Sequence, residues 1–113
     1  MHELSLMAGM LGIIAGEARG QGFTRVSRIV LEIGALSGVE PEALRFAFDV
    51  SARGTVAEGA ELEIEETEGR AQCGACGHTV PVRGTWGGCP ACGTDALKVI
   101  AGKETRVKYL DVD

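Results

Sequence analysis

The chain has 113 residues and a formal net charge of −5, with 45% hydrophobic and only 4% aromatic residues. This length allows one modest hydrophobic core of aliphatic side chains. The acidic balance argues against nucleic-acid binding, because a protein that binds phosphates needs a basic face. No secretory signal or membrane span is visible, so we expect a cytoplasmic protein without membrane contacts.

The first part of the chain predicts a helix followed by a strand. Apolar residues recur at three- and four-residue steps from Leu4 to about Ala18, which is the pattern of an amphipathic helix. They are Leu4, Met7, Ala8, Leu11, Ile14, Ala15 and Ala18. The side chains of residues 25–33 then follow a two-residue alternation, so we expect a strand with Ile29, Leu31 and Ile33 on one face.

A second helix and two more strands are expected further along. Pro41 suits the first turn of a helix, since its missing N–H costs nothing there. Residues 60–66 predict a strand with Leu62 and Ile64 facing inward. A final strand over residues 106–112 is expected to carry Leu110 and Val112 on one face and Val107 and Tyr109 on the other, and to pair with the first sheet. The residues expected to face inward from the second helix are Leu44, Ala47, Phe48 and Ser51.

Together with the cysteine pairs at residues 73–76 and 89–92, these elements predict an α+β fold: two helices packed on a small, mostly antiparallel sheet, with an inserted zinc-ribbon domain of short β-hairpins. The expected division is one domain of residues 1–69 plus 103–113 and a second of residues 70–102.

All four cysteines lie in one 20-residue stretch, as the pairs Cys73–Cys76 and Cys89–Cys92 with twelve residues between them. Two C-x-x-C pairs at this separation can close a tetrahedral thiolate site around one metal ion, for which zinc is the leading choice. A closed four-thiolate site leaves no open coordination position, so this metal is expected to stabilise the fold. Disulfides require an oxidising compartment, and a thioredoxin-type motif uses one C-x-x-C at a helix start. Iron, as in rubredoxin, remains an alternative.

The N-terminus holds a second set of candidate ligands. The amine of Met1, with the amide and imidazole of His2, can chelate one ion, and the amide of Glu3 can supply a further nitrogen. Such nitrogen-rich, planar geometry suits Ni(II) or Cu(II). An exposed histidine without function is the alternative, and Glu3 can simply complement the dipole of the first helix. His78 can be a further ligand or simply an exposed imidazole on the metal loop. Likewise, Glu40 can be a further ligand or the carboxylate at the start of a helix.

No arrangement typical of catalysis is visible. Ser37 and Ser51 have no histidine in a plausible local arrangement, and no glycine cluster has the form of a P-loop or a dinucleotide-binding turn. We therefore expect a protein that is not an enzyme.

Four segments of the chain are distinctive in combination: residues 1–6 (MHELSL), residues 33–40 (IGALSGVE), residues 46–49 (FAFD) and the two C-x-x-C pairs. Together they resemble the HypA/HybF family of hydrogenase-maturation nickel chaperones. The resemblance covers the whole chain. It implies an α/β domain that binds nickel through Met1, His2 and Glu3, and a zinc domain held by Cys73, Cys76, Cys89 and Cys92.

The resemblance also implies a role. Structural Zn(II) and transferred Ni(II) are the implied metals, and the GTPase HypB and the large subunit of [NiFe] hydrogenase are the implied partners, with urease maturation as a related role in the family. A monomer or weak homodimer is expected. Where some family members have Asp near position 40, this chain has the longer Glu40, which leaves that ligand open. The competing classes are a zinc-ribbon adaptor that only binds proteins and a rubredoxin-like electron carrier.

Overall fold

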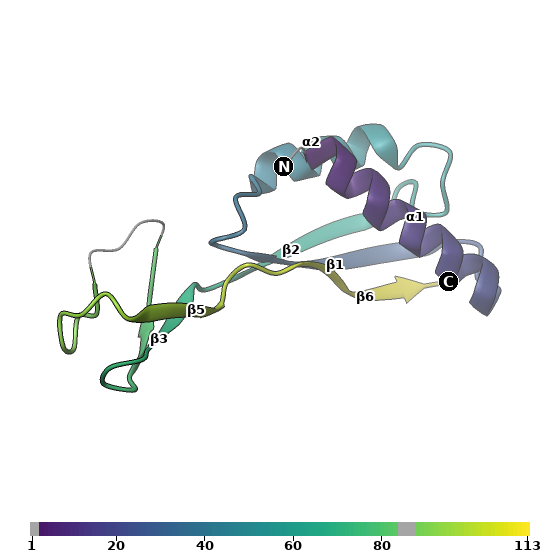
Figure 1. Ribbon diagram of the computed structural model, residues 1–113. Coiled ribbons are helices and arrows are strands. Elements are labelled where there is room, and N and C mark those ends of the chain that lie inside the picture. Colours follow the sequence, from purple (N-terminus) through teal and green to yellow (C-terminus); the bar gives the residue numbers. More distant parts are fainter. Residues whose placement is uncertain (1–2, 84–87) are drawn as a thin grey trace.

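The computed structural model describes residues 3–83 and 88–113. The molecule is elongated, with extents of 53 × 25 × 17 Å. It contains two three-stranded sheets, one of order β2-β1-β6 and one of order β4-β3-β5. Both helices lie on the same face of the first sheet, and the second sheet forms the opposite end of the molecule (Figure 1). Neither helix, within the residues described, is long and apolar enough to cross a membrane.

Helix α1 spans Glu3–Gln21 and supplies much of the core of the larger half. Its position agrees with the predicted helix, but its buried face differs slightly. Leu4 is half exposed and Ala8 is exposed, whereas Met10, which was not predicted to face inward, is buried. The buried side chains are Met7, Met10, Leu11, Ile14 and Ala18.

Strand β1 (Val26–Gly34) is the central strand of the first sheet. It pairs in parallel with β2 (Glu61–Thr67) and antiparallel with β6 (Thr105–Val112). The parallel pairing is possible because helix α2 (Pro41–Ser51) provides the crossover between β1 and β2. The remaining pairings, in the second sheet, are antiparallel, so the mostly antiparallel arrangement is confirmed.

Helix α2 begins as the sequence predicts. Glu40 is its N-cap in an extended conformation, and Pro41 occupies the first turn. Leu44, Ala47 and Phe48 are buried against α1 and the sheet, as expected from their spacing.

The faces of β6 were predicted wrongly. Val107 and Leu110 both pack against the main core, although strict alternation would place them on opposite faces. The reason is a register shift: Val30 lies opposite Tyr109 and Leu31 opposite Val107, so Lys108 is an extra residue in β6.

The face of this sheet opposite the helices is covered by long charged side chains. Arg28 pairs with Glu63 at 2.7 Å, and Lys108 pairs with Glu65 at 2.8 Å. Val30 is fully buried on this strand although no helix covers it. The aliphatic stems of the charged residues can shield such a side chain while their charged ends stay in water.

The second sheet consists of β3 (Arg70–Cys73), β4 (Thr79–Pro81) and β5 (Leu97–Ala101). Two short hairpins were expected here, but among the described residues only β3 and β4 form one. Strand β5 instead pairs with β3, so the chain that follows Cys89 and Cys92 returns to lie beside the strand that ends at Cys73. The small core of this sheet comprises Ala71, Val80 and Val82, with Leu36 and Leu97 packed against it.

A tight backbone junction joins the two sheets. The amide of Leu36 donates to the carbonyl of Gly102 at 2.7 Å, and the amide of Gly34 donates to the carbonyl of Glu104 at 2.7 Å. A Cβ at Gly34 would overlap the carbonyl of Gly102, so only glycine fits there. The Glu104 carboxylate accepts hydrogen bonds from the Thr67 hydroxyl at 2.6 Å and the Gly102 amide at 3.1 Å.

Candidate metal centre

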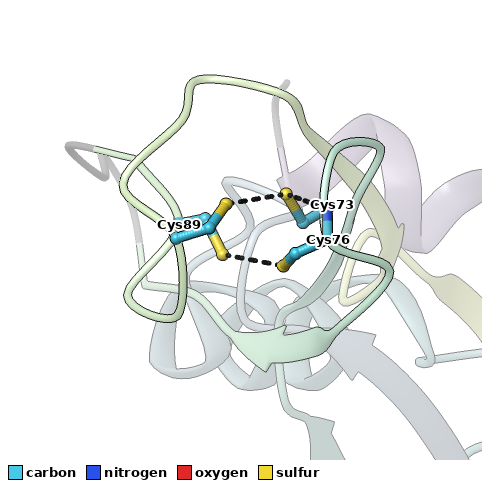
Figure 2. Close-up of side chains that lie close together, drawn as sticks. Cys73, Cys76 and Cys89 are labelled. Atoms are coloured by element: carbon cyan, nitrogen blue, oxygen red, sulfur yellow. Dashed lines mark hydrogen bonds between the residues drawn. The ribbon is translucent and has the colours of Figure 1, made fainter.

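The four cysteines come together at the end of the second sheet. Their Sγ atoms all lie within 4.8 Å of one another. Cys73 ends β3 and Cys76 follows in the turn, while Cys89 and Cys92 belong to the segment before β5. Figure 2 shows the side chains of Cys73, Cys76 and Cys89 directed toward a common centre. Cys73 and Cys89 are buried, and Cys76 and Cys92 are exposed.

Each C-x-x-C pair and the two residues after it form a turn, called a knuckle below: residues 73–78 are the first and residues 89–94 the second. The two knuckles share one backbone pattern. In the first, the Cys73 amide donates to the carbonyl of His78 at 2.9 Å, and the Gly77 amide donates back to the carbonyl of Cys73 at 2.9 Å. In the second, the Cys89 amide donates to the carbonyl of Thr94 at 2.8 Å, and the Gly93 amide to that of Cys89 at 2.7 Å.

The glycine after each pair has the conformation expected from the sequence. Gly77 has φ = 80° and Gly93 has φ = 79°, values in the left-handed region that favours glycine. Each glycine turns the chain, and its amide donates a hydrogen bond to the carbonyl of the first cysteine of its own pair.

The spacing of the sulfurs fits a tetrahedral metal ion. Cys73 and Cys92 Sγ lie 3.6 Å apart, and Cys76 and Cys89 Sγ lie 3.7 Å apart. Four thiolates at a zinc–sulfur distance of about 2.3 Å would be separated by about 3.8 Å in a regular tetrahedron. All four cysteines are free of disulfides. The donor set and its geometry therefore suit one thiophilic ion, such as zinc.

Hydrogen bonds favour thiolates in part of the cluster. The Thr94 hydroxyl, followed by the Cys76 amide, lowers the pKa of Cys73 to about 6, and the same hydroxyl lowers the pKa of Cys92. Cys76 behaves differently. The amide of His78 acts to lower the pKa of Cys76, but desolvation and the neighbouring cysteines outweigh it and raise this pKa to about 12. Adjacent sulfurs thus compete for negative charge, and a bound dication would relieve that competition.

Among the residues that the structure describes, two polar side chains contact the sulfurs from outside. Nδ1 of the exposed His78 lies 3.3 Å from Cys76 Sγ. The hydroxyl of Thr94 lies 3.3 Å from Cys92 Sγ and 3.4 Å from Cys73 Sγ. Sequence reasoning singled out His78 but missed Thr94. The repeated pattern C-x-x-C-G could have indicated it, because Thr94 follows the second glycine as His78 follows the first.

At the N-terminus, Met1 and His2 lie outside the described residues. Glu3 begins α1, and its carboxylate accepts a hydrogen bond from the backbone amide of Glu40 at 3.0 Å. The Glu40 carboxylate in turn accepts from the amide of Glu42 as the N-cap of α2. The structure therefore brings together Glu3 and Glu40, two candidate ligands that lie 37 residues apart in the chain.

Comparison with known proteins agrees with this arrangement. A family model described as "Hydrogenase/urease nickel incorporation, metallochaperone, hypA" matches residues 1–112. The hydrogenase maturation factor HypA of Acidithiobacillus ferrooxidans is 52% identical over 113 residues, which is the full length of both chains. The HypA of Azotobacter vinelandii is 46% identical, again over the full length of both.

Solved structures share the fold. The solution structure of the Ni metallochaperone HypA from Helicobacter pylori matches with a TM-score of 0.73 at 23% identity, covering 99% of this chain and 97% of that one. A second solution structure of a HypA protein matches with a TM-score of 0.75, covering 99% and 96%. With a full-length family match and close to half of its residues shared with curated relatives, this chain belongs to the HypA family of hydrogenase maturation factors.

Proposed function

We propose that this protein is a nickel metallochaperone that binds Ni(II) through the Met1 amine, His2 and Glu3. It delivers the ion for the maturation of [NiFe] hydrogenase, while Cys73, Cys76, Cys89 and Cys92 hold a structural zinc ion. The observation that carries the proposal is the match of the nickel-incorporation family model to residues 1–112. Urease is a second recipient consistent with the description of that model.

The surroundings of Glu3 support a nickel site at the start of α1. Glu3 opens the first turn of α1, so a nickel ion bound there would lie at the end of the helix and outside its regular turns. The Glu3 carboxylate is held against the Glu40 amide, which keeps the first helical residue beside the N-cap of α2. Nitrogen ligands in this arrangement favour Ni(II) over the zinc that thiolates favour.

The proposed zinc role is structural. Four thiolates complete a tetrahedron and leave no position for a reacting water or substrate. Among the described residues, the core of the second sheet buries only Ala71, Val80 and Val82, which is too little apolar surface to hold three short strands. Metal binding would supply the missing stability of residues 70–102, whereas residues 1–69 with 103–113 have the larger core of α1, α2 and β1.

A carrier of this kind performs no catalytic step, and we propose that the protein is not an enzyme. We place it in the cytoplasm as a monomer or weak homodimer. Its proposed partners are the GTPase HypB and the large subunit of the hydrogenase. Exchangeable ligands at the N-terminus would let such a partner displace them one at a time.

Nickel titration of the zinc-loaded protein with a free Met1 amine tests the proposal. Wild type is expected to bind one Ni(II), and His2→Ala and an N-acetylated protein are expected to lose that binding with zinc content unchanged. His78→Ala is the matched control, because the chain contains only these two histidines. Equal weak binding by wild type and His2→Ala would overturn the nickel proposal and favour a zinc-ribbon adaptor.

Delivery is tested separately in cells. A strain that lacks its own HypA and therefore has an inactive [NiFe] hydrogenase should recover activity with the wild-type chain and with His78→Ala. His2→Ala should not restore activity at limiting nickel. Full recovery with His2→Ala would argue against nickel delivery through the N-terminus.

A further inference from the structure

We infer that Thr94 is a positioning residue of the four-cysteine site, whose hydroxyl is shared by Cys92 of its own knuckle and Cys73 of the other and slows the loss of the metal. The inference rests on the proposed zinc site and goes beyond it, because Thr94 is not one of the proposed ligands. It is carried by the geometry of the two knuckles.

The first step is the equivalence of Thr94 and His78. Both follow a C-x-x-C-G motif, and both use their backbone carbonyl to accept the amide of the first cysteine of their own pair. This hydrogen bond places each side chain next to the second cysteine of the pair. His78 reaches Cys76 at 3.3 Å, and Thr94 reaches Cys92 at 3.3 Å.

The second step is the difference between them. The hydroxyl of Thr94 also lies 3.4 Å from the sulfur of Cys73, which belongs to the first knuckle. Cys73 and Cys92 Sγ are 3.6 Å apart, so the hydroxyl sits against one edge of the sulfur tetrahedron. For His78, the structure gives a sulfur contact within its own knuckle. Thr94 therefore links the knuckles.

The third step is the chemistry of this contact. A hydroxyl has one hydrogen, which it can donate to either thiolate or share between them. Hydrogen bonds to thiolate ligands withdraw charge from the sulfur and hold its orientation. Partners of this type outside the ligand set commonly change metal affinity by about 10- to 100-fold when removed. Thr94 is positioned for this role because its own backbone is fixed by the Cys89 amide.

The exposure of Cys92 explains how the Thr94 hydroxyl can affect release of the metal. Cys92 is exposed, so a chelator or a competing thiol can approach that sulfur, whereas Cys73 is buried. Loss of Cys92 from the metal would open the site at one of its two exposed sulfurs. A hydroxyl that holds Cys92 to the buried Cys73 opposes that step.

The test compares Thr94→Val, which keeps the shape but removes the hydroxyl, with Thr94→Ser, which keeps the hydroxyl. Zinc transfer from the purified, zinc-loaded full chain to excess 4-(2-pyridylazo)resorcinol is followed over time. Thr94→Val is expected to release zinc about 10-fold faster or more, and Thr94→Ser to stay close to wild type. Thr79→Val, at an exposed threonine of the same sheet, is the matched control and should not change the rate.

A second measurement separates a hydrogen bond from a loss of packing. In the cobalt-substituted proteins, the sulfur-to-cobalt charge-transfer band should move to lower energy in Thr94→Val and return toward the wild-type position in Thr94→Ser. Release rates and spectra that are the same in Thr94→Val as in wild type would overturn the role of Thr94 and leave the zinc site intact. Failure of the wild-type chain to bind one zinc or cobalt ion would overturn both the inference and the proposed zinc site.

Discussion

The carboxylate of Glu3 accepts a hydrogen bond from the backbone amide of Glu40 at 3.0 Å, which joins the first residue of α1 to the N-cap of α2. The contact holds the start of the chain against the loop that leaves β1. The same loop carries Leu36, which packs on the core of the second sheet. Glu3 and the second sheet are thus attached to opposite ends of one short segment.

Removing the Glu3 carboxylate should loosen this attachment. We expect Glu3→Ala to lower the free energy of unfolding by about 1 kcal/mol, since the Glu40 amide loses its acceptor. Glu3→Gln keeps an acceptor oxygen and should retain most of the stability. Urea denaturation of both variants measures the difference, and equal stability of Glu3→Ala and wild type would show that the contact contributes nothing.

Removing the metal should unfold one half of the molecule selectively. In the part of the chain that the structure describes, the second sheet has a core of three buried apolar residues, whereas the first sheet packs against two helices. After treatment with a chelator, or in Cys73→Ser, amide signals of residues 70–101 should lose their dispersion in NMR spectra. Signals of β1 and α1 should remain, and zinc should restore the spectrum of the chelated wild type. Retention of the dispersed signals of residues 70–101 without metal would contradict a structural role.

The junction glycine should be intolerant of any side chain. Gly34→Ala places a methyl group on the carbonyl of Gly102, so the backbone of one partner must move and the protein should be strongly destabilised. Gly9→Ala is the control. A Cβ at Gly9 meets nothing within 4 Å, so alanine there should raise stability by about 0.5–1 kcal/mol through helix propensity. Thermal denaturation compares the two, and a Gly34→Ala protein as stable as wild type would refute the tight junction.

Acid should weaken the junction through Glu104. The Thr67 hydroxyl, together with the amides of Glu104 itself and Gly102, lowers the pKa of this carboxyl below its ordinary value of 4.5. Because the folded-state pKa is the lower one, the stabilisation is fully present above the ordinary value. It is lost as the pH falls through the lowered pKa of the folded state.

Glu104→Gln should therefore be less stable than wild type at neutral pH and should lose less stability as the pH falls below 4.5. Unfolding by urea at several pH values measures this dependence. Thr67→Val should reduce the acid sensitivity in the same direction, since it removes the strongest cause of the lowered pKa. Parallel pH profiles for wild type and Glu104→Gln would show that another group controls the acid response.

Local sequence patterns predicted the individual elements well. Pro41 marked the start of α2, and the spacing of Leu44, Ala47 and Phe48 identified its buried face, because both are properties of a single helix. The cysteine spacing indicated the metal cluster for the same reason: each knuckle is a short turn whose backbone bonds close within a few residues.

The errors arose where distant segments meet. Alternation along β6 misplaced Val107 because the extra residue Lys108 shifts the register against β1, and a bulge has no clear signal in one strand alone. Two hairpins were expected in the metal module because neighbouring strands usually pair. Strand β5 pairs with β3 instead, across both knuckles.

By itself, the sequence determined the order and type of the elements, the four-cysteine cluster and the family, since each depends on residue types at short, fixed spacings. Only the tertiary structure decided that Glu3 meets Glu40, that Gly34 lies on Gly102 and that Thr94 reaches Cys73. These contacts join residues from 21 to 68 positions apart. Their partners are chosen by how the sheets and turns pack together, which no local pattern encodes.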